Sequence, residues 1–525
     1  MHRAISAGSR SQWNAERLRL LFAAFDGCDT VVLANREPFQ HDLAPDGRVV
    51  VHHSSGGLVT ALEPLMEACA GVWVAHGSGT ADRLVVDEQD RLAVPPANPT
   101  YRLRRVWLDD RERRGYYYGF ANEGLWPLCH RAHVQPVFRS DDFAMYQRVN
   151  GRFANAVCTE VNDNSPLIFV QDYHFALAPR LIRRRLPLSC IVAFWHIPWP
   201  HPRDYAILPW RRQLLEGLLG ATILGLQTPE DCRHFVETVR LLPGARVNLA
   251  RDVVTYAGTQ TTVRAYPISI EWPSRWADRA PSTDACRTAV CSEIGAPSDV
   301  LLGIGVDRLD YTKGINEKFL AVEQLLERRP ELRERFVFVQ IAEPSRHCLA
   351  AYREVRRRIV ETADRINRRF SAGRYRPIIL IEAHREPADV YRFLRAADLC
   401  YVGSLHDGMN LVAKEFVSAR EDCRGVLILS EFAGAARELT SALIVNPYAI
   451  DRCAQALAQA LVMPEAQQAE RMIAMRSVVA RHNVYRWAGE ILTDAARLRK
   501  VKTGGRELLP ASPARLDDHV GQADF

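Results

Sequence analysis

The chain has 525 residues, of which 47% are apolar and 25% charged, and this predicts a soluble protein of about two to four domains. A net charge of +6 is small for this length and predicts no nucleic-acid partner, and no apolar run is long enough to span a membrane. The twelve cysteines are scattered without a C-x-x-C pair, which argues against disulfides and clustered zinc and favours a cytoplasmic protein.

Residues 1–27 are expected to form a polar N-terminal extension or a first helix, and residues 503–525 a flexible tail. Between them, short apolar runs alternate with amphipathic stretches. The alternation, with helical periodicity at 316–328 and 350–370, is typical of buried parallel strands and predicts a doubly wound α/β fold. The expected strands are 30–34, 167–170, 191–195, 222–226, 301–306, 336–341, 378–381, 399–402, 426–429 and 442–445.

A change of composition around 272–300, just before a new series of strands, indicates a boundary between two α/β domains. We place these domains at 28–275 and 276–480. No internal repeat relates them.

Polar residues follow many of the predicted strands. Ligands in open parallel sheets bind beyond the carboxyl ends of the strands. A single polar residue after a strand is common, because turns are polar. A set of such residues from both halves of the chain predicts a cleft that the two halves share. The set consists of Arg36, Asp172, His196, Arg308, Lys313, Arg346 and Asp407.

The chemistry of this set suits phosphate and sugar. Arg308 and Lys313 lie five residues apart on one loop and can neutralise a diphosphate in place of a metal ion. A solvated surface pair is the alternative for these two cations. His196 lies in the rigid string WHIPWP, although a lone histidine is more often structural than catalytic.

Two predicted helix starts suit anions, because the first amides of a helix lack partners within it. Gly56 and Gly57 precede a helix expected at 59–69, and Asp407-Gly-Met-Asn precedes one at 411–419. Glu415 lies about one and a half turns into the second helix, where a carboxylate suits the two hydroxyls of a ribose. A surface helix charge is the alternative for Glu415.

Several motifs are absent from the sequence. No Asp-x-Asp occurs, so the metal-binding signature of the other large class of sugar-nucleotide transferases is missing. The P-loop, G-x-S-x-G and H-E-x-x-H motifs are absent as well. An aromatic patch with Tyr117 and Trp126 could be core or a platform for sugar stacking, and composition alone favours core.

Together the strings resemble one family, the retaining glycosyltransferases that make trehalose 6-phosphate. The resemblance runs from about residue 30 to about residue 490, and some of the strings that carry it are weak individually. The strings are NREP, SSGGL, YYYGFANEGLWP, QDYH, WHIPWP, YPISIEW, DRLDYTKG, QIAEPSR, HDGMNLVAKE, SEFAGAARELTSALIVNPY and NVYRW, of which DRLDYTKG followed by HDGMNLVAKE is highly specific. The family implies two Rossmann-like domains facing across a cleft (GT-B type), with a final helix, 481–502, crossing back to the first domain.

The resemblance also implies roles, in a transfer with retention that needs no metal or other cofactor. The acceptor, glucose 6-phosphate, would be held by Arg36, Tyr117, Trp126, Asp172 and Arg346, with the two arginines on its phosphate. The donor, expected to be UDP-glucose, would be held by Gly56, Arg308, Lys313, Met409, Asn410, Leu411, Val412 and Glu415. The catalytic set would be His196, Arg308, Lys313 and Asp407.

Three positions depart from the family pattern. Gln171 replaces a histidine, His406 replaces an arginine, and Arg385 stands where well-known members have an aromatic residue near the nucleotide base. The last two leave the donor open among uridine, guanosine and adenosine diphosphate glucose. A homo-oligomer is also left open.

Three other functions compete with trehalose 6-phosphate synthesis. NREP and the string ILPWR at 207–211 are similar to a related branch that uses glycerol 3-phosphate, whereas Gly56-Gly57, His174 and Arg346 match the trehalose branch. A non-catalytic sugar-phosphate sensor is the second alternative. The residue types matched in the cleft weigh against it. A pseudo-glycosyltransferase that joins cyclitols is a third alternative, but no motif in the sequence indicates it.

Overall fold

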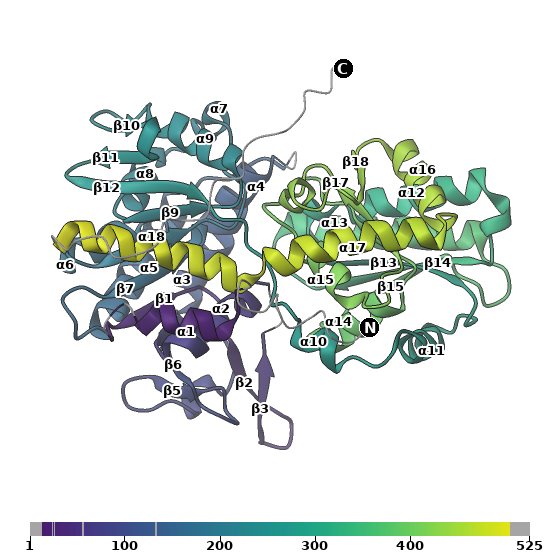
Figure 1. Cartoon of the computed structure of the whole chain (residues 1–525), viewed down its shortest axis with the longest axis horizontal. Coiled ribbons are helices and arrows are strands. Elements are labelled where there is room, and N and C mark those ends of the chain that lie inside the picture. The colour runs from purple at the N-terminus through teal and green to yellow at the C-terminus, as the bar shows by residue number, and fades with distance from the viewer. Residues whose placement is uncertain (1–12, 24, 26, 55–56, 132–133, 504–525) are drawn as a thin grey trace, which may run out of the picture.

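The computed structural model describes residues 13–23, 25, 27–54, 57–131 and 134–503. It has two α/β lobes side by side, each built on its own sheet, with the last two helices running across both (Figure 1).

The first lobe contains a ten-stranded sheet in the order β10-β11-β12-β9-β8-β7-β1-β4-β6-β5. Its seven central strands, from β12 to β6 in that order, are parallel, and the order reverses between β1 and β7. The strands are β1 (Thr30–Leu33), β4 (Val72–His76), β5 (Arg91–Val94), β6 (Tyr101–Val106), β7 (Leu167–Gln171), β8 (Cys190–Phe194), β9 (Ile223–Leu226), β10 (Arg246–Asn248), β11 (Val253–Tyr256) and β12 (Thr259–Ala265). A separate hairpin pairs β2 (Phe39–Leu43) with β3 (Val49–His53).

The second lobe contains six parallel strands in the order β15-β14-β13-β16-β17-β18. This order reverses between β13 and β16. The strands are β13 (Leu301–Arg308), β14 (Phe336–Glu343), β15 (Ile378–Ile381), β16 (Leu399–Val402), β17 (Val426–Ser430) and β18 (Leu443–Val445). Both sheets therefore have the strand order of dinucleotide-binding folds, and the predicted fold class is confirmed.

Helices cover both faces of each sheet, which explains why the strands are apolar throughout. In β1, Val31 and Leu33 pack into one core and Val32 into another. The helices are α1 (Ala15–Ala23), α2 (Gly57–Cys69), α3 (Asp110–Arg113), α4 (Trp126–His130), α5 (Ser140–Thr159), α6 (Ala178–Arg185), α7 (Pro202–Tyr205), α8 (Arg211–Leu218), α9 (Pro229–Val239), α10 (Arg275–Arg279), α11 (Thr283–Ile294), α12 (Ile315–Arg328), α13 (Ala350–Phe370), α14 (Pro387–Ala396), α15 (Leu411–Ala419), α16 (Ile450–Leu461), α17 (Glu465–Arg481) and α18 (Val484–Thr503).

The last two helices join the lobes. Helix α17 packs on α15 of the second lobe, and α18 packs on α1, α2 and β8 of the first (Figure 1). At the junction between them, the backbone N–H of Val484 donates to the carbonyl of Ile270 at 2.8 Å. The tail expected at 503–525 lies outside the described residues, except for Thr503, which is the last residue of α18.

The ten expected strands are confirmed to within two residues at each end, but eight strands were missed: the mostly apolar β4 and seven that contain polar residues, namely β2, β3, β5, β6, β10, β11 and β12. Strand β6 reads YRLRRV, and its Arg105 is fully buried between Glu37 and Asp82. A search for apolar runs cannot find a strand whose core position is a buried ion pair. Among the described residues, no helix is both long and apolar enough to cross a membrane.

Candidate active site

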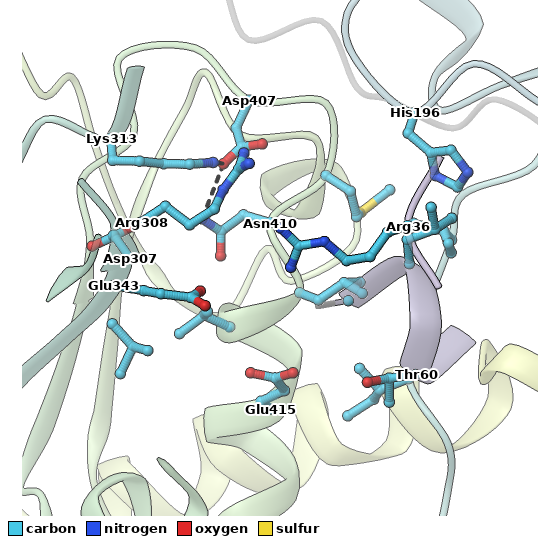
Figure 2. Close-up of a pocket in the computed structure, with 18 of the residues that line it drawn as sticks. Arg36, Thr60, His196, Asp307, Arg308, Lys313, Glu343, Asp407, Asn410 and Glu415 are labelled. Atoms are coloured by element: carbon cyan, nitrogen blue, oxygen red, sulfur yellow. Dashed lines mark hydrogen bonds and ion pairs between the residues drawn. The ribbon is translucent and has the colours of Figure 1, made fainter. Parts of the chain in front are cut away.

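In each sheet, the strand ends at the point where the strand order reverses line one cavity between the lobes. This cavity has a volume of about 390 Å³, and Figure 2 shows its lining residues. Arg36 follows β1 and Asp172 follows β7 at the reversal of the first sheet. Arg308 ends β13, and the loop after β16 carries Asp407, at the reversal of the second sheet. Four strand ends that are distant in sequence therefore meet at one site.

Every predicted site residue that the structure describes lines this cavity. These residues are Arg36, Tyr117, Trp126, Asp172, His196, Arg308, Lys313, Arg346, Asp407, Met409, Asn410, Leu411, Val412 and Glu415. Gly56 lies outside the described residues, but Gly57, the first residue of α2, lines the cavity.

Lys313 and Asp407 form an ion pair on the second-lobe side of the cavity (Figure 2). Lys313 Nζ lies 2.5 Å from Asp407 Oδ2, and Asn410 Nδ2 donates to the same oxygen at 3.1 Å. Burial acts to raise the pKa of Asp407, but the charge of Lys313 and these hydrogen bonds outweigh it and hold the pKa at about 2. Asp407 is therefore ionised at neutral pH.

Asn410 shapes the start of α15. Its backbone adopts a positive φ of 73°, and its Oδ1 accepts from the N–H of Ala413 at 3.3 Å. The preceding N–H groups, of Leu411 and Val412, belong to the first turn and have no acceptor within the helix. This arrangement suits a phosphate oxygen at the helix N-terminus.

Two arginines approach the cavity from opposite sides (Figure 2). Arg308 stacks on Trp126, with its guanidinium carbon 5.1 Å from the ring centre. Arg36 is exposed on the facing side. Neither has an ion-pair partner among the described residues, so both guanidiniums can bind an anion.

Asp172 and His196 are hydrogen-bonded to each other just beyond the ends of β7 and β8. Asp172 has a φ of 70° and a ψ of 172°, which an L-residue rarely adopts, and its Oδ1 accepts from the His196 N–H at 3.1 Å. The His196 ring faces Gln171, with Nε2 2.8 Å from Oε1. Burial lowers the pKa of His196 to about 3, so its ring is neutral at neutral pH.

We expect the free energy of unfolding to fall as pH rises from about 4 to about 7, because two carboxyls of the cavity hold protons that the unfolded chain loses. Burial raises the pKa of Asp172 to about 7 against weaker opposing hydrogen bonds and charges, and burial raises that of Glu415 to about 7. Each group then lowers stability by up to about 1.4 kcal/mol per pH unit in that interval. Urea denaturation across that pH range should give a flatter profile for Asp172→Asn and for Glu415→Gln. A variant with the wild-type slope would show that its carboxyl is already ionised.

The aromatic patch divides between core and cavity. Tyr116 is buried in the first lobe, as composition suggested, and its hydroxyl donates to Asn35 at 2.9 Å. Tyr117 and Trp126 instead line the cavity, and Tyr117 stacks on His174 with ring centres 5.7 Å apart. The π-helical segment Arg114–Leu125, a geometry frequent at functional sites, carries Tyr117.

The two remaining departures from the family pattern occupy different places. Arg385 lines the cavity and donates to Glu293 at 2.8 Å. His406 is not among the lining residues. Its Nδ1 lies 2.8 Å from the carbonyl of His130, so it joins the two lobes behind Asp407.

Further lining residues could have been predicted from the same observation, that polar residues directly after predicted strands face the ligand site. Asn35, Gln227 and Asp307 line the cavity and each follow a predicted strand directly, but none of them is among the predicted site residues. Glu343 at the end of β14 also lines the cavity, but it is two residues beyond the predicted strand end. Glu271 and Thr60, which follow no predicted strand, have no such signal.

Known proteins match the chain over most of its length. Residues 29–497 match the model of glycosyltransferase family 20. The chain is 37% identical over 480 residues to the trehalose-6-phosphate synthase of Mycolicibacterium gilvum (strain PYR-GCK), covering 89% of this chain and 93% of the relative.

Solved structures of other proteins are also similar to this chain over most of its length. An E. coli structure bound with UDP-2-fluoro glucose aligns with a TM-score of 0.78 at 31% identity, over 89% of this chain and 99% of that one. A Burkholderia xenovorans α,α-trehalose-phosphate synthase (UDP-forming), in complex with glucose-6-phosphate, aligns with the same TM-score, identity and coverage.

Proposed function

Since the chain belongs to glycosyltransferase family 20, we propose that it is a trehalose-6-phosphate synthase of the GT-B type. It transfers glucose from a nucleotide-glucose donor to glucose 6-phosphate with retention, giving α,α-trehalose 6-phosphate. The observation that carries this proposal is the single cavity in which Arg36, Asp172 and His196 of one lobe face Arg308, Lys313 and Asp407 of the other.

We assign the donor to the second-lobe side of the cavity. Arg308 and Lys313 bind its diphosphate, together with the backbone at residues 409–412 and that of Gly56. Glu415 binds the ribose. With a pKa of about 7, its carboxyl is present at neutral pH both as a hydrogen-bond donor and as an acceptor, which suits a pair of hydroxyls.

We assign the acceptor to the first-lobe side and to the adjoining Arg346. Arg36 and Arg346 bind the phosphate, since guanidinium and phosphate pair through parallel hydrogen bonds. Asp172 contacts sugar hydroxyls, and the rings of Tyr117 and Trp126 form the wall beside them.

The transfer breaks the bond between the anomeric carbon of the donor and the diphosphate oxygen. The new bond to the acceptor hydroxyl forms on the same face, and the departing diphosphate takes the hydroxyl proton. Arg308 and Lys313 stabilise the negative charge that develops on the diphosphate. His196 and Asp407 hold the donor glucose. His196 does so as a neutral hydrogen-bonding group, because its pKa of about 3 leaves it no proton to give as an acid at neutral pH.

We propose UDP-glucose as the donor. The E. coli relative binds UDP-2-fluoro glucose. Arg385 is placed at the base by resemblance, and there a guanidinium can donate to a carbonyl oxygen of uracil or guanine, which adenine lacks. This favours uridine or guanosine diphosphate glucose over the adenosine form.

We propose domain boundaries at 28–275 and 276–480, with 481–502 as the crossing helix. The separate sheets and the packing of α18 on the first lobe support this division. We also propose a cytoplasmic setting, which the twelve cysteines, all of them free thiols, favour.

A matrix of substrates tests the function. Purified protein is incubated with UDP-, GDP- or ADP-glucose and with either glucose 6-phosphate or glycerol 3-phosphate, and released nucleotide and product are measured. We expect α,α-trehalose 6-phosphate with the retained anomeric configuration in its NMR spectrum. Product from glycerol 3-phosphate alone would overturn the acceptor assignment. Ligand binding without nucleotide release would instead identify a sensor.

A further inference from the structure

A buried carboxylate links the two lobes behind the acceptor side of the cavity. Asp310 lies in the loop after β13, is fully buried and is absent from the cavity lining. Its Oδ1 accepts from Trp126 Nε1 of the first lobe at 3.3 Å. Its Oδ2 accepts from Tyr352 Oη at 3.1 Å and from Arg346 Nη1 at 3.2 Å, so one side chain ties both lobes together.

Arg346 is held between the same partners. Its guanidinium carbon lies 4.4 Å from the ring centre of Trp126, and its Nη2 donates to Tyr173 Oη of the first lobe at 3.3 Å. Hydrogen bonds to Asp310 on one side and Tyr173 on the other therefore fix the plane of the guanidinium. Neither lobe alone supplies all of these contacts.

Arg308 and Arg36 differ from Arg346 in how their charges are compensated. Both cations line the cavity without an ion-pair partner among the described residues, whereas Arg346 is compensated by a buried carboxylate. A carboxylate that does not face the cavity cannot contact substrate. It can set the direction of a cation that does, because a charge-assisted hydrogen bond is strong and directional.

We propose that Asp310 is a positioning residue for the phosphorylated acceptor, fixing Arg346 and Trp126 across the gap between the lobes so that the acceptor subsite forms as one unit. This inference rests on the proposed function, in which Arg346 meets the acceptor phosphate. Asp310 acts on the binding of the acceptor, and it leaves the binding of the donor and the bond-breaking step largely unchanged.

Asp310→Asn tests the proposal, because it keeps the size of the side chain and removes its charge. We expect KM for glucose 6-phosphate to rise by roughly tenfold or more, since a charge-assisted contact is lost. The carboxylate also accepts the N–H of Thr312 at 3.0 Å and so caps the short turn that carries Lys313, but the amide oxygen of Asp310→Asn can accept the same N–H. We therefore expect KM for the nucleotide-glucose to stay within about twofold and kcat within about threefold. A double-mutant cycle with Trp126→Phe should show effects that are not additive.

Glu112→Gln is the matched control. Glu112 is as buried as Asp310 and is ion-paired with Arg148 and Arg152. Unlike Arg346, these two arginines lie outside the cavity lining. Its variant should keep the wild-type kinetic constants. If Asp310→Asn does not fold, Tyr352→Phe removes the hydroxyl shared by Asp310 and Arg346, and it should raise the same KM.

The outcomes separate this inference from the proposed function. An unchanged KM for glucose 6-phosphate, or a fall in kcat alone, would overturn the role of Asp310 while leaving the synthase assignment intact. If the wild type uses only glycerol 3-phosphate, the synthase assignment fails, and the same comparison of KM values with that acceptor decides the role of Asp310. If the wild type transfers to neither acceptor, both fail.

Discussion

Arg308→Ala should lower kcat by roughly two to three orders of magnitude and leave the protein folded. Arg308 reaches the cavity from the end of β13 and stacks on Trp126, but it has no ion-pair partner among the described residues. Its charge is therefore available to the diphosphate as the donor bond breaks. Folding loses only the stacking contact, about 0.5–1 kcal/mol. Nucleotide release at saturating substrates, with urea denaturation of the same preparation, measures both effects.

Arg83→Ala is the control for that variant. Arg83 also stacks on a tryptophan, with its guanidinium carbon 4.2 Å from the Trp107 ring centre, but it is exposed and does not line the cavity. It should lose the same stacking energy and keep normal turnover. Near-normal turnover of Arg308→Ala would remove Arg308 from the reaction.

The lysines of this arginine-rich chain illustrate what sequence alone could predict. Only five occur, and three of them, Lys313, Lys318 and Lys414, are buried and bonded to carboxylates. A compact ammonium has three donors on one atom, whereas a planar guanidinium has five spread over a fork, all of which need acceptors when buried. The motif around Lys313 predicted a phosphate ligand. Its pairing with Asp407 joins two loops 94 residues apart, and this could not be read from either loop.

The fold was predictable because it depends on local pattern, and the site was predictable where it depends on strand ends. Arg36, Asp172 and Asp407 follow apolar strands, so one rule located all three. Asp310 stands in the same string as Arg308, yet its role depends on Trp126, 184 residues away in sequence. Contacts of that kind need the tertiary structure, because no periodicity relates the two partners.

Gly408→Ala should reduce kcat/KM by roughly a hundredfold, because the new methyl group would displace the Asp407 loop. An added Cβ would lie 2.3 Å from the carbonyl oxygen of His196, and backbone on both sides of this contact between the lobes cannot yield as a flexible side chain can. A displacement of about 1 Å is enough for such a loss of activity, since the loop carries Asp407 and leads into α15. The free energy of unfolding should fall by about 1–3 kcal/mol, as expected for overpacking.

Gly151→Ala provides the comparison. Gly151 lies inside α5, and a Cβ there meets nothing within 4 Å, so alanine should stabilise the helix by about 0.5–1 kcal/mol and leave kcat/KM unchanged. Steady-state kinetics and urea denaturation of both variants separate the clash from the general effect of replacing glycine. Wild-type activity in Gly408→Ala would mean that the two lobes can move apart at this contact without cost. The close approach of His196 to the Asp407 loop would then not be needed for transfer.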